Sequence, residues 1–97
     1  MLSYLSTQFL QVPVTSDVPD PSGYTVRMAF LPDGQQPTNT DWHPATWINS
    51  TTGWRAQFLV GPNGGAVTAQ PGMWRPWVRI TAAPEDIIES TGPIQVT

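Results

Sequence analysis

Apolar and polar residues alternate along much of this chain, which is the pattern of β-strands that bury one face. In the segment 54–60 every second residue is apolar, beginning with Trp54, and Arg55 and Gln57 occupy two of the positions between them. Alternate side chains of a strand point to opposite faces, so this segment is predicted to be a half-buried strand. Related patterns occur near residues 8–14, 23–31, 44–49, 66–69, 73–82 and 92–97. We therefore expect about seven short strands.

The inward faces of these strands supply the expected hydrophobic core. Its members are Leu10, Val12, Val14, Tyr24, Val26, Met28, Phe30, Trp47, Trp54, Ala56, Phe58, Val60, Trp74, Val78, Ile80, Ile94 and Val96. In the strand at 73–82 the outward positions include Arg75, Trp77 and Arg79. Trp77 is thus predicted to face away from the core.

Turn-forming residues separate the strands. Asn63-Gly64 tolerates the positive φ of a tight reversal, which predicts a hairpin joining 54–60 to 66–69. Pro76 cannot donate a ladder hydrogen bond, so we expect the paired part of its strand to be 77–81. The segment 84–89 is the one place where a single helical turn is expected. This arrangement predicts an all-β fold, an Ig-like antiparallel β-sandwich with no substantial helix.

Length and composition are consistent with one folded domain. The chain has 97 residues, of which 39% are hydrophobic and 11% charged, too apolar and too weakly charged for a disordered segment. We expect a single sandwich domain over 9–97, preceded by an N-terminal arm at 1–8. Residues 1–6 contain neither a basic residue nor an apolar stretch of signal-peptide length, and no run of residues reaches membrane-spanning length. Secretion by a signal peptide and membrane partners are therefore not expected.

The charge balance argues against nucleic acid as a partner. Four arginines and no lysine stand against seven acidic residues, which gives a net charge of −3. Such a chain cannot neutralise a run of phosphates. There is no cysteine, which excludes disulfides, thiolate metal sites and cysteine nucleophiles.

No residue pattern points to catalysis or to a metal. His43 is the only histidine, and although Asp41 is near it in the sequence, no G-x-S-x-G motif accompanies the two. One histidine and scattered carboxylates do not make a zinc or calcium motif. We expect a protein that is not an enzyme, with no catalytic residue, metal ligand or cofactor.

Tryptophan is the most informative residue type, with five in the chain. Trp77 lies between Arg75 and Arg79 on the outward face, and tryptophan and arginine are enriched at protein interface hot spots. These three residues are therefore candidates for partner binding. Trp42, with Asp41 and Asn39 nearby, is an alternative candidate for stacking against a carbohydrate.

Several segments together resemble small Ig-like virion structural proteins of long-tailed actinobacterial phages. The shared features are a proline-glycine corner, an aromatic residue, a V-W-V-R-like strand, a short proline-glutamate loop and a last strand opened by glycine. In this chain they lie at 71–81, 84–85 and 92–96, with further likeness at 26–34, 41–42 and 59–62. The likeness covers most of the chain from about residue 8.

The resemblance implies a structural role in a virion that is assembled in the host cytoplasm. The small size favours a capsid decoration protein or a head-proximal accessory protein, and the alternative is a minor tail protein or a surface carbohydrate-binding module. The expected partners are the major capsid protein and further copies of the chain, as a homo-oligomer or as lattice neighbours. The N-terminal arm, through Leu2, Tyr4 and Leu5, is expected to contribute to these contacts.

Overall fold

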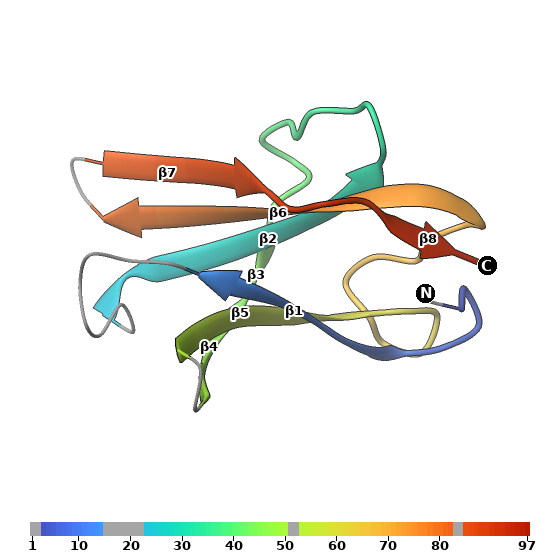
Figure 1. Ribbon diagram of the computed structural model, residues 1–97, viewed down its shortest axis with the longest axis horizontal. Helices are drawn as coiled ribbons and strands as arrows, with labels where there is room; N and C mark the ends of the chain where they lie inside the picture. The colour runs from blue at the N-terminus through green and yellow to red at the C-terminus, as the bar shows by residue number, and fades with distance from the viewer. Residues whose placement is uncertain (1–2, 15–22, 51–52, 83–84) are drawn as a thin grey trace.

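The chain folds as an antiparallel β-sandwich in a computed structural model that describes residues 3–14, 23–50, 53–82 and 85–97 (Figure 1). The described residues form eight strands and no α-helix, which confirms the predicted all-β class. The strands are β1 (Gln8–Val14), β2 (Thr25–Pro32), β3 (His43–Pro44), β4 (Thr46–Ser50), β5 (Gly53–Val60), β6 (Gly72–Ala82), β7 (Glu85–Ser90) and β8 (Ile94–Val96).

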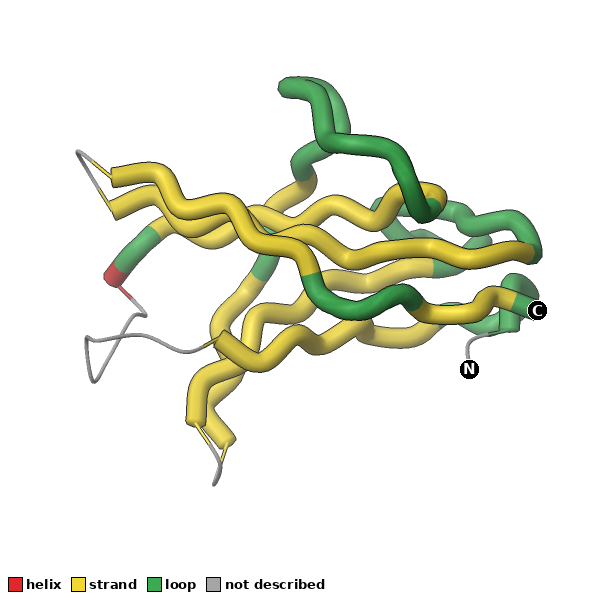
Figure 2. The backbone as a smooth tube through the Cα atoms, turned by 45° about the horizontal axis from the view of Figure 1, so that its top comes forward, coloured by secondary structure: helices red, strands yellow, loops and turns green. Residues whose placement is uncertain are grey.

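Two sheets make the two layers of the sandwich. One has three strands in the order β1-β5-β4, and the other has five strands, with the order β3-β2-β6-β7 and β8 also paired to β6. The described N-terminal residues and the C-terminus lie at the same end of the molecule (Figure 1). In Figure 2 the loop between β2 and β3 rises away from the strands as a long excursion.

All buried members of the core between the sheets except Ala69 are alternate residues that the sequence pattern places there. Its buried members are Leu10, Val12, Val26, Met28, Phe30, Ala56, Phe58, Val60, Ala69, Val78 and Val96. Trp47, Trp74 and Ile80 are partly exposed and pack against this core. The inward faces predicted from the pattern are thus confirmed for β1, β2 and β5, although Tyr24 and Trp54, also predicted as core residues, are only partly buried.

The predicted hairpin between 54–60 and 66–69 is wrong. Residues 66–69 form no strand, and Val67 makes only an isolated bridge to Val60. β1 pairs with one edge of β5 from Trp54 to Val60, and β4 takes the other edge from Gly53 to Gln57, which leaves only residues 58–60 open to a returning strand. The turn at Asn63-Gly64 therefore redirects the chain toward the second sheet.

The helical turn expected at 84–89 is also wrong, because β7 occupies residues 85–90. This strand pairs with β6 from Trp77↔Ser90 to Ala82↔Glu85. The β-branched pair Ile87 and Ile88 favours extended backbone, and the open edge of β6 offers a full set of partners. Tertiary pairing thus prevails over the weak helical signal of the acidic residues.

Pro76 lies in the middle of a continuous strand, although the paired part was expected to start after it. On one side β6 pairs with β2 along its length, including Phe30↔Pro76. On the other side β8 pairs with residues 72–74 and β7 with residues 77–82, which leaves a gap at Pro76. The Pro76 carbonyl accepts from Thr91 N–H across that gap (3.1 Å). Since the N and O of a strand residue point to the same side, the missing N–H of Pro76 falls where no ladder bond is needed.

The segment 3–7, expected to be part of an arm, is held on the sandwich by hydrogen bonds of its backbone and of the Thr7 hydroxyl. Tyr4 N–H donates to the Thr97 carbonyl (2.8 Å), and Thr7 Oγ1 accepts from Asn63 N–H (3.0 Å). Gly61 lies so close to Ser6 that an added Cβ would collide with the Ser6 carbonyl. The side chains of Tyr4 and Leu5 remain exposed, and Leu2 lies outside the described residues.

Gly61→Ala tests this packing. The backbone at Gly61 has φ +130°, and a Cβ there would also meet Thr7 Cα at 2.5 Å. We expect a loss of about 1–3 kcal/mol in the free energy of unfolding by urea. Gly72→Ala is the matched control, because its φ of +145° imposes the same kind of backbone strain while nothing lies within 4 Å of its added Cβ, so it should lose clearly less stability than Gly61→Ala. Equal stability of the two variants would show that segment 3–7 does not pack on Gly61.

Candidate functional site

The outer face of the five-stranded sheet carries the three residues singled out on β6. Alternation along β6 buries Pro76 and Val78 and leaves Arg75, Trp77 and Arg79 partly exposed on the other face. We call these three residues the Trp77 face. The predicted outward orientation of Trp77 is therefore confirmed.

Trp77 lies over the neighbouring strand. Its cross-strand partner is Ala29, which belongs to the outward set of β2 but is 0% exposed. A side chain as small as alanine leaves room for an indole to lie across the sheet. Trp77 is consequently half-buried and does not project from a flat surface.

Arg79 is held by a carboxylate on the adjacent strand. Its Nε donates to Asp86 Oδ1 (2.9 Å) and Oδ2 (3.0 Å), and its Nη2 donates to Oδ2 (2.6 Å). These hydrogen bonds lower the pKa of Asp86 below its ordinary value, and the attraction of the Arg79 charge acts in the same direction. Thr81 Oγ1 also donates to Asp86 (3.2 Å). Arg79 is thus a fixed, paired cation.

Arg75 is paired in the same way at the other end of the face. Its Nε donates to Asp33 Oδ1 (3.0 Å), and its Nη1 donates to the Thr91 carbonyl (3.0 Å). Asp33 begins the β2–β3 loop, which spans residues 33–42, and Thr91 lies between β7 and β8. Arg75 therefore ties two loops to the strand that carries Trp77.

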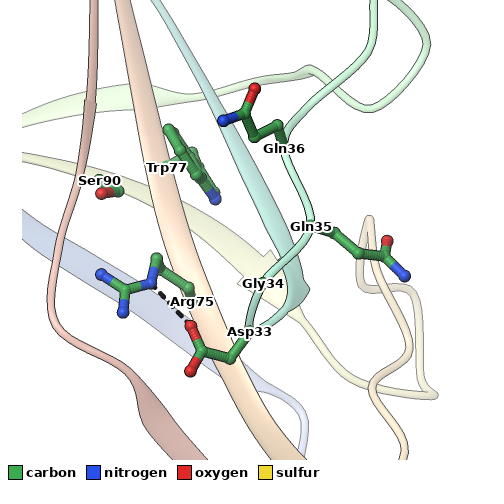
Figure 3. A pocket seen from close by; sticks show the side chains of 7 residues that line it. All are labelled: Asp33, Gly34, Gln35, Gln36, Arg75, Trp77 and Ser90. Carbon is green, nitrogen blue, oxygen red and sulfur yellow. Dashed lines mark hydrogen bonds and ion pairs between the residues drawn. The ribbon is translucent and has the colours of Figure 1, made fainter.

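Two grooves lie beside Trp77, between the β2–β3 loop and the strands. The first has a volume of about 280 Å³ and is lined by Asp33, Gly34, Gln35, Gln36, Arg75, Trp77 and Ser90. Figure 3 shows these residues, with the Gln36 side chain extending from the loop toward the indole. The second has a volume of about 320 Å³ and is lined by Gln36, Pro37, Asn39, Trp42, Trp77, Arg79 and Ile88. Because Gln36 and Trp77 line both, the two grooves are neighbours across these side chains.

The structure brings together two sets of residues that the sequence treats as alternatives. Trp42 and Asn39 line the second groove with Trp77 and Arg79, and the Arg79 guanidinium carbon lies 5.8 Å from the centre of the Trp42 ring. This is within the range of a cation–π contact. Asp41 is not part of the lining, and its carboxylate accepts from Thr38 N–H (2.7 Å) and Thr38 Oγ1 (3.0 Å). Asp41 therefore shapes the loop.

The indole N–H of Trp77 is buried and has no hydrogen-bond partner among the residues that the structure describes. Two other tryptophans differ in this respect: Trp47 Nε1 donates to the Tyr24 carbonyl (3.0 Å) and Trp74 Nε1 to the Gln70 carbonyl (2.8 Å). Buried polar groups without partners are rare in folded proteins and call for an explanation. On the Trp77 face, the indole N–H of Trp77 is the buried polar group for which the described residues provide no acceptor.

His43 and Asp41 do not form an acid–base pair. His43 lies in β3, where it pairs with Met28 and its ring stacks on Phe58 at 6.3 Å between centroids. In the described parts of the chain, no three His, Cys, Asp or Glu residues gather as a metal site would require. The same parts contain no helix long and apolar enough to span a membrane.

A second surface lies at the N-terminal end. Tyr4, Leu5 and Phe9 are 42%, 68% and 58% exposed, and we call them the N-terminal ridge. Phe9 faces outward from the three-stranded sheet because its neighbour Leu10 is buried, and its cross-strand partner is Leu59. Tyr4 and Leu5 were predicted from the sequence, whereas Phe9, Gln36 and Ile88 were not. Phe9 could have been found from its parity with Leu10, but Gln36 and Ile88 depend on the path of the loop and on β7.

Asp86→Asn tests the electrostatics of the Trp77 face. Because the folded-state pKa of Asp86 lies below its ordinary value of 3.8, the wild type should be more stable than Asp86→Asn above that pH. This advantage should disappear as the pH falls through the lowered pKa, where the folded carboxylate takes up its proton. Urea unfolding from pH 2 to pH 7, about the span over which carboxylates titrate, measures the difference. An Asp86 carboxyl signal that titrates in NMR at or above 3.8 would contradict the pairing with Arg79.

Comparisons with protein-family models, with curated proteins and with solved structures found no match for this chain. The function must therefore be argued from the two surfaces themselves. One is a polar, aromatic pair of grooves on the Trp77 face, and the other is an exposed apolar ridge near the N-terminus.

Proposed function

We propose that this protein is a non-enzymatic structural protein of a phage virion, a head decoration or head-proximal accessory protein that binds the major capsid protein and further copies of itself. The likeness of its strands and corners to small Ig-like virion proteins supports this role. The sandwich fold and the arrangement of exposed apolar residues are compatible with it. Location on the tail is the neighbouring alternative.

The observation that carries the proposal is the N-terminal ridge. Three large apolar side chains are exposed within the six residues 4–9, and clustered exposed apolar side chains are typical of protein interaction sites. Their backbone is not loose, because Tyr4 is bonded to Thr97 and Thr7 to Asn63. A fixed apolar surface loses little conformational entropy when it binds, so even a small area contributes to affinity. The ridge, with Leu2 next to it in the sequence, is the surface we assign to the capsid protein.

The strand that carries Phe9 also offers a surface for contacts between copies of the chain. β1 is an edge strand of the three-stranded sheet, and Phe9 lies on it. Edge strands offer unpaired backbone groups to a neighbouring chain. On a symmetric lattice a modest contact is repeated many times, so weak pairwise affinity is sufficient for stable decoration.

The Trp77 face was predicted from the sequence to bind the capsid, and this stays a prediction. Both of its arginines are already paired within the chain, to Asp33 and Asp86. An arginine contributes most to an interface when its partner lies on the other protein. We therefore place the capsid contact on the N-terminal ridge.

Co-sedimentation with undecorated phage capsids tests the proposal, with isolated tails as a parallel sample. We expect saturation at a copy number that matches the capsid lattice, and at least about tenfold weaker binding for Leu5→Ser because an exposed apolar anchor is lost. Binding to tails alone would overturn the assignment to the head, and binding to neither would overturn the virion role.

Ile87→Ser is the matched control for Leu5→Ser. Ile87 is also exposed, at 41%, and lies on β7, away from the two termini (Figure 1). Its replacement should leave capsid binding unchanged. Equal loss of binding in both variants would show that the ridge is not the contact surface.

A further inference from the structure

We propose that the grooves on either side of Trp77 bind a neutral saccharide, with Trp42 as a stacking surface and the Trp77 indole N–H as a hydrogen-bond donor. This site is separate from the N-terminal ridge, and it does not depend on the virion role proposed above. Four observations support it.

The first is the unpaired indole. Trp77 Nε1 is shielded from solvent and donates to no group of the described protein. An unpaired donor costs stability in the free protein, and an acceptor oxygen supplied by a ligand would remove that cost. The N–H therefore favours a ligand that carries hydroxyl or carbonyl oxygens.

The second observation concerns charge. Arg75 and Arg79 border the grooves, but Asp33 and Asp86 already occupy their guanidinium groups. An anionic ligand would have to compete with these carboxylates and would be repelled by them. A neutral ligand meets no such competition, so the paired arginines indicate an uncharged saccharide.

The third observation is the pairing of aromatic and amide side chains. Trp42 and Trp77 line the second groove with the amides of Gln36 and Asn39. The apolar C–H face of a sugar ring packs on an indole, and amides both donate to and accept from hydroxyl groups. Sites for small ligands combine apolar walls and a few polar groups in this way.

The fourth observation is the position of Gln36 between the two grooves. Gln36 is exposed and lines both of them, and its side chain extends toward Trp77 in Figure 3. Since the indole N–H is shielded, a ligand reaches it only when a side chain of the groove wall turns aside. Gln36 is exposed on the loop and is not packed in the core, so we infer that a change of its rotamer opens the groove wall beside the indole.

Titration of ¹⁵N-labelled protein with neutral hexasaccharides tests the proposal. The probes are maltohexaose, mannohexaose and the hexamer of N-acetylglucosamine, each to about 10 mM, enough to detect a Kd near 1 mM. At least one should shift the indole N–H signals of Trp77 and Trp42. Trp77→Phe, which keeps a ring but removes the N–H, and Trp42→Ala should each weaken binding about tenfold.

Trp74→Phe is the matched control, because its indole N–H is already bonded to Gln70 and it lines neither groove. It should bind the same saccharide as the wild type does. Should Trp77→Phe fail to fold, Trp42→Ala keeps the test decisive, since Trp42 lies outside the core cluster.

Three results would overturn the proposal. One is the absence of binding by all three neutral probes, and another is unchanged binding by Trp42→Ala. The third is preferential binding of a hyaluronan hexasaccharide, which would identify an anionic ligand. Capsid binding is read separately: its loss by Leu5→Ser with saccharide binding intact would show that the two surfaces act independently.

Discussion

The structure depends on strand β6 pairing on both of its edges at once. Along one edge it pairs with β2, and along the other it pairs first with β8 and then with β7. The eleven residues of β6 thus pair with three of the other four strands of the larger sheet, β2, β7 and β8. Pro76 is compatible with this role because its missing N–H falls in the gap between β8 and β7.

The same strand determines where the polar chemistry lies. Burial of Pro76 and Val78 in the core places Arg75, Trp77 and Arg79 on the opposite face, with one carboxylate from the β2–β3 loop and one from β7 in reach. Each arginine thereby fixes an element beside Trp77. None of the described groups around the indole accepts a hydrogen bond from its N–H.

The sequence alone predicts the strands in which apolar and polar residues alternate regularly. It does not predict the conformation of segments that depends on which strand edge is free to pair with them. The inward residues of β1, β2 and β5 follow from alternation alone, as does the outward position of Trp77. Segment 66–69 looks like a strand, but β4 already occupies most of the edge of β5 on which it would pair, and only the bridge from Val67 to Val60 forms. Segment 84–89 looks like a helical turn, but residues 85–90 pair as a strand with the open edge of β6. The meeting of Trp42 with Arg79 requires the path of a ten-residue loop, which no local pattern encodes.

The gap at Pro76 also divides the outer edge of the sheet into two units of different stability. The described side chains of β7, from Asp86 to Ser90, are all exposed, so the strand is held by its backbone ladder and by the pair between Asp86 and Arg79. β8, in contrast, buries Val96 in the core. Amide hydrogens of β7 should therefore exchange through a local opening that leaves the sandwich intact. Such an opening would break the ion pair between Arg79 and Asp86 and move the wall of the second groove that carries Ile88.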